Sequence, residues 1–209
     1  MHTPRGAATF FVLLIVLWAG LSWSARPKPP HPASLVVKVV LPESMGSGTP
    51  VAVRGNQTAI LTARHVVEDE SMSLPTPMFA ELAGRQYPVV QVCMHPELDV
   101  AIVWVEGRLP VVPMDHAPAV LGQRVQACGW LFGVQLQLDE GLVCEPDKAS
   151  VDMLPGCSGG SIFREGEIVG VVSKTISISS PFGGIPVGAC VDFVPIADAW
   201  RWICATLDA

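Results

Sequence analysis

Short apolar runs separated by turn residues make up the chain from residue 34 onward. Runs of this length and spacing are typical of strands in barrels or sandwiches. They form two groups on either side of the proline-bearing stretch 109–118, and this division indicates two β-barrels, although no internal repeat links the two groups. The predicted strands are 35–40, 50–53, 59–62, 87–94 and 100–105 in the first group, and 124–130, 134–138, 141–144, 160–163, 168–173 and 187–194 in the second.

One helical pattern stands out, and it lies at the C-terminal end of the chain. Pro195 is a residue type that favours the start of a helix, and apolar residues then recur at helical spacing. We therefore predict a terminal helix over 195–207 that follows an all-β fold. The apolar face of this helix consists of Ile196, Trp200, Ile203, Cys204 and Leu207.

The N-terminal segment differs from the rest of the chain. Residues 7–23 read AATFFVLLIVLWAGLSW, without a charge, and Arg5 precedes them. This is the composition of an export signal. Ser22 and Ser24 are small residues at positions that a signal peptidase accepts, but the uncharged stretch 6–25 is also long enough to span a membrane.

Segment 1–24 is therefore predicted to be a signal peptide or an N-terminal membrane anchor. In both cases the rest of the chain lies outside the cytosol, in a secreted or periplasmic location. An uncleaved segment would tether the domain to a membrane through residues 7–23. Residues 25–33 hold several prolines and are predicted to form a stiff, extended spacer.

Composition narrows the class of protein. Hydrophobic residues make up 50% of the chain, charged residues 15%, and the mean hydropathy is +0.44. These values exclude a disordered or low-complexity protein. The formal net charge is −6, whereas surfaces that bind nucleic acids are basic, so we expect no nucleic-acid partner.

The cysteines do not have the spacing of metal ligands, because there is no CxxC pair and no nearby pair of histidines. We predict no metal and no cofactor. An exported chain permits disulfides, and Cys128 and Cys144, which flank a predicted hairpin, are candidates for cross-strand neighbours. The other pairings stay open. The six cysteines are at positions 93, 128, 144, 157, 190 and 204.

Residues 156–160, Gly-Cys-Ser-Gly-Gly, form the most informative segment of the chain. A serine flanked by glycines fits a tight turn whose freed N–H groups can point at an oxyanion. Taken alone, this segment is also compatible with a glycine-rich turn that has no catalytic function. The segment also matches the GxSxG elbow of α/β-hydrolases, but that elbow needs a histidine after the serine. All five histidines precede Ser158, which excludes an esterase or lipase of that fold.

Two further residues complete a candidate catalytic triad. His65 follows an apolar strand, and Asp99 comes just before the apolar run 100–105. A carboxylate next to a buried strand needs a partner. An imidazole that donates Nδ1–H to Asp99 can present Nε2 to the Ser158 hydroxyl. The chain order His, Asp, Ser is that of chymotrypsin-like barrels.

The sequence resembles a trypsin-like serine protease, most closely the bacterial HtrA (Deg) branch. The resemblance runs from about residue 46 to residue 194 and implies an all-β, chymotrypsin-like fold of two six-stranded antiparallel barrels with a C-terminal helix. It divides the protease domain 34–209 into barrels at about 34–108 and 120–194, followed by the helix 195–207. The segments that carry it are GSGTPVAV, AILTARHVV, HPELDVAIVWV, QRVQACGWLFG, EGLVCE, PGCSGGSIF and GEIVGVVS.

The resemblance also implies an activity and a role for each site residue. The activity is hydrolysis of peptide bonds in a protein or peptide substrate through an acyl-enzyme. Ser158 would be the nucleophile, His65 the general base and then acid, and Asp99 the residue that orients the imidazole. The N–H groups of Gly156 and Ser158 would form the oxyanion hole. Ser173, Lys174 and Thr175 would form the edge strand that binds an extended substrate.

Some positions depart from the secreted trypsins. Cys157 stands where cleavage-activated trypsins carry an aspartate, so we expect no activation by zymogen cleavage, and we expect the thiol to be buried or in a disulfide rather than nucleophilic. Asp152 has the offset of the trypsin specificity carboxylate, but Pro155 resembles the HtrA loop, which favours an exposed loop aspartate. His95 and His116 are expected to be surface or loop residues. No PDZ domain is expected after the helix.

Two alternatives to a serine endopeptidase stay open. One is a non-catalytic barrel protein that binds peptides in the cleft, because a triad in the sequence does not guarantee a formed oxyanion hole. The other is a structural surface protein tethered through residues 7–23. The substrate, the preferred cleavage site, the disulfide pattern and the oligomeric state do not follow from the sequence.

Overall fold

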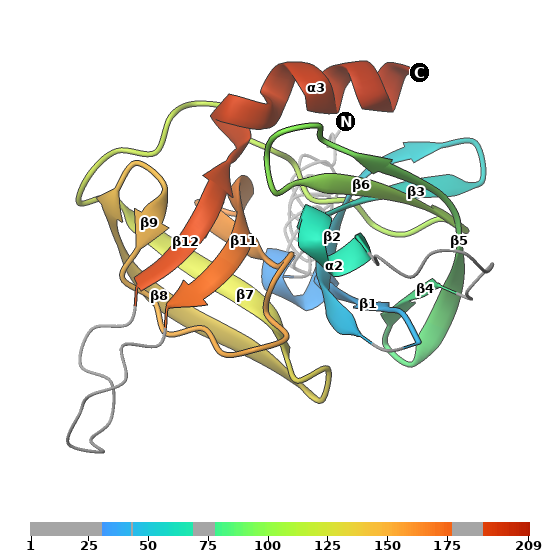
Figure 1. The fold of residues 1–209 in the computed structure, drawn as a ribbon, viewed down its shortest axis with the longest axis horizontal. Coiled ribbons are helices and arrows are strands. Elements are labelled where there is room, and N and C mark those ends of the chain that lie inside the picture. Colours follow the sequence, from blue (N-terminus) through green and yellow to red (C-terminus); the bar gives the residue numbers. More distant parts are fainter. Residues whose placement is uncertain (1–30, 43, 69–77, 177–189) are drawn as a thin grey trace, which may run out of the picture. The chain divides into compact units, whose positions relative to one another are not determined.

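The computed structural model describes residues 31–42, 44–68, 78–176 and 190–209. These residues form two closed antiparallel barrels of six strands each, and a helix follows the second barrel (Figure 1). The predicted fold class is therefore confirmed. No helix within the described ranges is long and apolar enough to cross a membrane. The predicted signal or anchor, 1–24, lies outside the described residues.

The first barrel surrounds a core of aliphatic side chains. Strand β6 lies between β3 and β5, and its first five residues, Ala101–Val105, are all buried. A strand that is apolar on both faces is typical of the centre of a packed sheet. In order around the barrel the strands are β1 (Val37–Val40), β2 (Met45–Arg54), β3 (Gln57–Thr62), β6 (Ala101–Glu106), β5 (Arg85–Met94) and β4 (Phe79–Leu82).

The second barrel differs from the sequence prediction in two ways: two predicted strands form one, and the two-residue strand 148–149 was not predicted. The sequence predicts 134–138 and 141–144 as separate strands, but Gln135–Glu145 form the single strand β8. A Cβ at Gly141 would lie 2.1 Å from the Ser150 carbonyl oxygen, so this glycine permits a close approach of backbones within the strand. Around the barrel the strands are β10 (Ser161–Arg164), β11 (Glu167–Ile176), β12 (Cys190–Pro195), β9 (Lys148–Ala149), β8 (Gln135–Glu145) and β7 (Arg124–Leu131).

The terminal helix α3 (Ile196–Asp208) has the predicted amphipathic character. Ile196, Ala199 and Ile203 are buried against the barrels. Its tryptophans contact two histidines. The ring of His116 stacks on Trp200 with a centroid separation of 4.7 Å, and the ring of His95 meets Trp202 edge-on at 5.2 Å. Both histidines therefore take part in packing beside the helix.

The cysteines are not paired as the sequence suggested. Cys128 lies opposite Leu138 in the β7–β8 hairpin, so Cys128 and Cys144 are not cross-strand neighbours. Cys144 lies beyond Leu142, the last residue of β8 that pairs with β7. The Sγ atom of Cys144 instead lies 3.6 Å from that of Cys190 on β12.

Polar contacts join the two barrels. The hydroxyl groups of Thr49 on β2 and Ser161 on β10 share a buried hydrogen bond of 2.7 Å. The indole N–H of Trp130 on β7 donates to the Val36 carbonyl at 2.8 Å. The short 3₁₀ helix η1 (Pro32–Leu35) also reaches the second barrel, since the Cys128 thiol lies 3.6 Å from the Ala33 carbonyl oxygen.

Candidate active site

His65 lies in a single helical turn directly after β3. This turn, α2 (Arg64–Val67), is anchored by Val66 and Val67, whose side chains are buried. The His65 side chain points the other way and remains 44% exposed. The strand and the two buried valines therefore fix the backbone of His65, while its imidazole stays accessible to a substrate.

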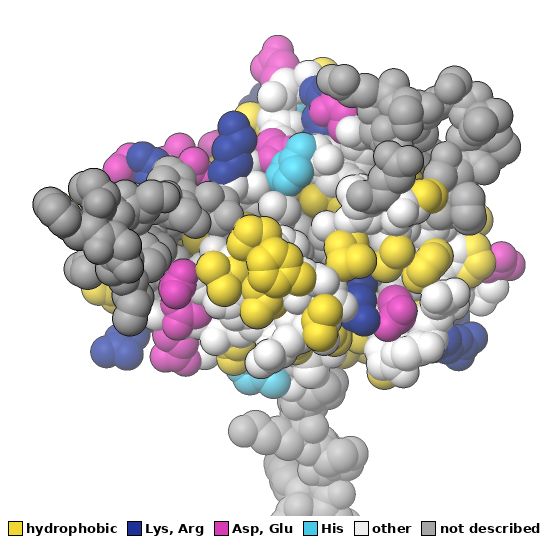
Figure 2. Space-filling view, turned by 60° about the horizontal axis from the view of Figure 1, so that its bottom comes forward, with side chains coloured by type: hydrophobic (Ala, Val, Ile, Leu, Met, Phe, Trp, Pro, Cys, Tyr) yellow, Lys and Arg dark blue, Asp and Glu magenta, His cyan; other side chains and the backbone are white. Residues whose placement is uncertain are grey.

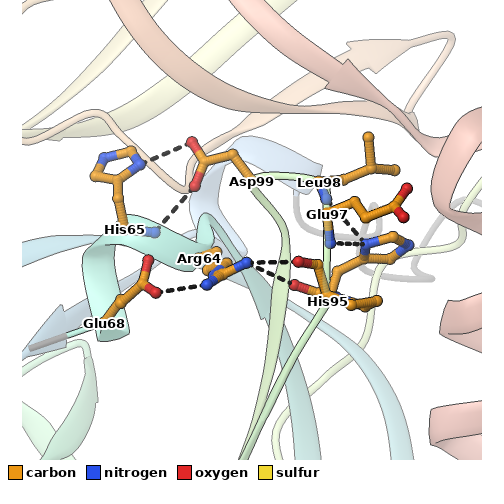
Figure 3. A network of polar contacts seen from close by, with 8 residues as sticks. Arg64, His65, Glu68, His95, Glu97, Leu98 and Asp99 are labelled. Atoms are coloured by element: carbon orange, nitrogen blue, oxygen red, sulfur yellow. Dashed lines mark hydrogen bonds and ion pairs between the residues drawn. The ribbon is translucent and has the colours of Figure 1, made fainter.

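Asp99 holds His65 through two hydrogen bonds (Figure 3). Its Oδ1 accepts the backbone N–H of His65 at 2.9 Å, and its Oδ2 accepts Nδ1–H of the imidazole at 2.8 Å. An imidazole that donates from Nδ1 has an acceptor lone pair on Nε2 when it is neutral. The structure thus brings these two predicted residues together, with the tautomer that a general base needs.

Arg64 ties the helical turn of His65 to the loop that carries Asp99. Its guanidinium donates to the carbonyl oxygens of His95 and Pro96, at 3.2 and 2.9 Å, and to Glu68 Oε1 at 2.6 Å (Figure 3). The His95 imidazole accepts hydrogen bonds from the backbone N–H groups of Glu97 and Leu98. Both the carbonyl and the side chain of His95 therefore hold this loop in place. This clamp keeps the backbones of His65 and Asp99 at a fixed separation.

Ser173 on β11 contributes a third hydrogen bond to the aspartate. Its hydroxyl, in a side chain that is only 8% exposed, donates to Asp99 Oδ2 at 2.5 Å. The sequence indicated Ser173 only as part of a substrate-binding strand. This contact crosses from one barrel to the other, and a serine in an apolar strand carries no signal of such a partner.

The hydrogen bonds at Asp99 determine its protonation. Partial burial alone would raise the pKa of its carboxyl group. The side-chain bonds from His65 and Ser173, with the backbone bond and the charge of His65, outweigh burial and lower the pKa from 3.8 to about 2. Asp99 is therefore a carboxylate over the whole neutral and mildly acidic range.

Residues 155–158 have every backbone carbonyl in a hydrogen bond. In a trans peptide the N–H points away from the preceding C=O, so these bonds also set the directions of the N–H groups. No described residue accepts a hydrogen bond from the N–H of Gly156 or Ser158, the two predicted oxyanion-hole donors. The donors to the carbonyls are Phe132 N–H to Pro155 (2.9 Å), Ser47 Oγ–H to Gly156 (2.9 Å), Gly160 N–H to Cys157 (2.9 Å) and Ser47 N–H to Ser158 (2.7 Å).

Two glycines of this loop are required by its backbone. Gly156 and Gly159 have φ angles of +96° and +79°, a region that other residues adopt only with strain. A Cβ at Gly159 would also lie 2.2 Å from both the Ser47 carbonyl oxygen and Thr62 Oγ1. The glycine-rich pattern in the sequence therefore reports both a tight turn and a close approach to the first barrel.

Ser158 is less tightly held than the other two candidate triad residues. Its hydroxyl makes one long contact, 3.4 Å to the carbonyl oxygen of Ser173. Within the described ranges no hydrogen bond joins His65 to Ser158. His65 and Ser158 belong to the same site, since Ser173 contacts both Ser158 and Asp99, the partner of His65. Their side chains are not hydrogen-bonded to each other in this structure.

The predicted substrate-binding strand has a free edge. Lys174, Thr175 and Ile176 pair with β12 on one side. On the other side β11 pairs with β10 only as far as Val171, and Val172 bonds to Gly160. Beyond that point no described residue pairs with β11 on this side. Lys174 is exposed, and the side chain of Thr175 lies outside the described residues.

Comparison with known proteins identifies the family and the fold. A sequence model of the trypsin-like peptidase domain matches residues 46–171, more than half of the chain. The chain belongs to the trypsin-like peptidase family. An uncharacterized peptidase of Corynebacterium glutamicum strain R is 27% identical over 169 residues, as is a peptidase of a second strain of that species. Each match covers 70% of this chain and 59% of the relative's length, so the chain spans less than two thirds of these curated relatives.

The fold is also that of a solved structure, a serine endoprotease from Yersinia pestis. The match has a TM-score of 0.67 and 20% sequence identity, and it covers 85% of this chain and 64% of that chain. Membership of the trypsin-like peptidase family and the fold of this endoprotease are thus shown. The GxSxG segment belongs to a double β-barrel here, in agreement with the exclusion of an α/β-hydrolase.

Two further residues near Ser158 of this trypsin-like domain have the environments that the sequence indicated. Cys157 is fully buried, and burial raises the pKa of its thiol to about 11. It is therefore a neutral thiol at physiological pH and a poor nucleophile. Asp152 is exposed; the Asp139 carboxylate accepts its backbone N–H at 2.6 Å.

Proposed function

We propose that this chain is an exported serine endopeptidase that hydrolyses peptide bonds through an acyl-enzyme. The observation that carries the proposal is the joint geometry of the site. Asp99 receives two hydrogen bonds from His65, and the N–H groups of Gly156 and Ser158 beside the candidate nucleophile have no acceptor among the described residues. A purely structural barrel has no need for either feature.

The proposed reaction uses the residues in the following way. The Ser158 hydroxyl attacks the carbonyl carbon of the substrate, and His65 Nε2 takes its proton. The N–H groups of Gly156 and Ser158 bind the oxyanion that forms. The tetrahedral species then collapses, the C–N bond breaks, and the amine leaves with the proton from Nε2. A water molecule attacks the acyl-enzyme with the same proton transfers and releases the acid.

Asp99 contributes by its charge and its geometry. While His65 carries the proton, the carboxylate lies 2.8 Å from Nδ1 and stabilises the imidazolium. A pKa of about 2 keeps Asp99 ionised throughout. We expect activity to be lost on acidification because a protonated imidazole cannot accept the serine proton, and not because Asp99 becomes neutral.

The free edge of β11 supports an extended peptide or protein as the substrate. Residues 173–176 present backbone groups that a substrate strand can pair with, and backbone pairing is independent of sequence. Figure 2 shows hydrophobic side chains gathered on one face of the molecule. The β7–β8 hairpin carries exposed hydrophobic side chains, which also support a partly apolar substrate. The exposed apolar residues of this hairpin are Phe132, Val134, Leu138 and Leu142.

The export part of the proposal comes from the sequence. Residues 7–23 have the composition of an export signal, and the same segment would tether the domain if it stays uncleaved. The proposed location is therefore secreted or periplasmic, with or without a membrane anchor. Mass spectrometry of the mature N-terminus of protein from the native host distinguishes the two forms.

A fluorophosphonate probe tests the proposed chemistry. It should label the wild-type protein at Ser158, and Ser158→Ala and His65→Ala should each abolish labelling. Ser150→Ala is a matched control, because Ser150 is an exposed serine outside the site, and it should label as the wild type does. Casein hydrolysis should likewise be retained by the wild type and Ser150→Ala and lost in Ser158→Ala and His65→Ala.

A peptide-binding protein without catalysis is the second candidate. The lack of a hydrogen bond between His65 and Ser158 in the described structure favours it, because a serine without its base is not activated. Peptide affinity together with neither probe labelling nor casein hydrolysis would establish this function and refute the endopeptidase.

A further inference from the structure

Ser47 lies where the two halves of the site meet, although the proposed reaction gives it no role. It belongs to β2 of the first barrel and is completely buried. We infer that Ser47 is a positioning residue that sets the shape of the oxyanion loop in the second barrel. This inference rests on the proposed function, and it extends that function to a residue that touches neither substrate nor reacting atoms.

Every polar group of Ser47 has a partner. Its N–H donates to the Ser158 carbonyl at 2.7 Å, and its hydroxyl donates to the Gly156 carbonyl at 2.9 Å. The same hydroxyl accepts the N–H of Trp130 at 2.7 Å, and the Ser47 carbonyl accepts the hydroxyl of Thr62 at 2.7 Å. One small residue therefore joins three segments of two barrels.

These bonds act on the peptide planes that flank the nucleophile. The bonds to the carbonyls of Gly156 and Ser158 fix the planes immediately before and after the plane that contains the Ser158 N–H. That middle plane is fixed by the bond from Gly160 to the Cys157 carbonyl. Without the Ser47 hydroxyl, the Gly156 carbonyl loses its partner, and the loop can rotate about its glycine. The direction of both oxyanion donors then becomes less defined.

Ser47 also connects this loop to the histidine. Its partner Thr62 is the last residue of β3, which leads into the turn that carries His65. The contact is close, since a Cβ at Gly159 would lie 2.2 Å from the Ser47 carbonyl oxygen. A Cβ at Gly46 would lie 3.0 Å from the Ser158 carbonyl oxygen. The packing thus brings the backbone of Ser47 directly onto the catalytic loop.

The test compares two buried hydroxyl groups on β2, those of Ser47 and Thr49, each of which bonds to the second barrel. Ser47→Ala removes the hydroxyl that reaches the oxyanion loop. Thr49→Val removes a second buried contact between the barrels, the bond to Ser161, which does not touch that loop. Both variants should lower the thermal unfolding midpoint. Only Ser47→Ala should lower kcat, by about 10- to 100-fold, because loss of a direct oxyanion donor costs about 100- to 1,000-fold.

Three measurements separate positioning from stability. For Ser47→Ala, KM should stay within about twofold of the wild-type value, because substrate pairing with β11 is unaffected. Inhibition by a peptide aldehyde, whose adduct carries an oxyanion, should weaken by about the same factor as kcat. Ser47→Cys keeps the volume filled and retains a weak donor, so its kcat should fall between those of the wild type and Ser47→Ala. It also serves if the alanine variant does not fold.

The outcomes are distinguishable from failure of the proposed function. A wild-type protein that neither reacts with fluorophosphonate nor cleaves casein refutes the endopeptidase itself. If the wild type is active, the inference is overturned by an unchanged kcat in Ser47→Ala and Ser47→Cys, by an equal loss in Thr49→Val, or by a loss expressed only in KM. A kcat loss restricted to the Ser47 variants, with a parallel loss of aldehyde affinity, supports it.

Discussion

His65 and Asp99 extend from the ends of two paired strands of the first barrel, whereas Ser158 lies in a loop of the second barrel. β3 and β6 are paired up to Thr62 and Ala101, so the residues just outside that pair emerge side by side. His65 and Asp99 then meet directly through their side chains. The Ser158 side chain has a single long contact, and the order in its loop comes from backbone bonds.

This difference follows from what each half has to do. The first barrel must hold one proton acceptor in one tautomer, which requires a fixed pair of side chains. The second barrel must offer two free N–H groups and a hydroxyl that can move toward a carbonyl carbon. For that purpose the backbone has to be rigid while its donors stay unpaired. Ser173 and Ser47 connect the two arrangements across the interface.

The largest expected effect tests whether the two halves act as one unit. Ser158→Ala and His65→Ala should each lower kcat by about a millionfold, because the base has no use without the nucleophile. The double variant should lose no more than about tenfold beyond either single variant. Single-turnover hydrolysis of an activated ester peptide measures all three. Multiplicative losses would show that the halves act independently.

Asp99→Asn should cost about 10⁴-fold in kcat. The amide can donate to His65 Nδ1, which moves the ring proton to Nε2 and removes the acceptor that Ser158 needs. KM should change little, because Asp99 contacts β11 only through the side chain of Ser173 and leaves the backbone groups of its open edge free. Steady-state kinetics that give kcat and KM separately across the pH range provide the measurement. Retention of more than about a tenth of the activity would contradict the assigned tautomer.

The contrast between the side-chain pair of the first barrel and the backbone loop of the second also explains what the sequence could predict. Side chains next to strongly apolar strands, such as His65 and Asp99, stand out because a charged or titratable group there needs a partner. The glycines around Ser158 stand out because the backbone requires them. The two barrels and the terminal helix follow from apolar periodicity.

Contacts across the interface between the barrels could not be predicted. Ser173 reaches Asp99 over 74 residues of sequence, and the Ser47 hydroxyl reaches Gly156 over 109. A buried serine has the same appearance in a sequence whichever partner it meets. Short strands such as β4 and β9 carry too few residues for a periodic signal. The acidic residues Asp139 and Glu140 separate two predicted apolar strands that together form the single strand β8.

Ser173→Ala should have a smaller effect, about a tenfold loss in kcat. The variant removes one of three hydrogen bonds to Asp99, while both bonds from His65 remain. The carboxylate is then less well oriented, and its pKa should rise toward its ordinary value. Ser173→Thr keeps the hydroxyl and should recover most of the activity. Equal kcat values for the alanine variant and the wild type would show that the first barrel orients Asp99 unaided.

The smallest effect concerns stability in acid. The pKa of Asp99 is about 2 in the folded protein against 3.8 ordinarily, so the unfolded chain binds the proton first as the pH falls. The carboxylate therefore stabilises the fold above about pH 4, and this contribution disappears as the pH falls to about 2. With screening of the part-exposed group it amounts to about 1 kcal/mol. Asp99→Asn lacks this titration, so the difference in thermal unfolding midpoint between it and the wild type should shrink from pH 5 to pH 2. A difference that stays constant would mean that the bonds from His65 and Ser173 do not hold the charge of Asp99 in the folded state.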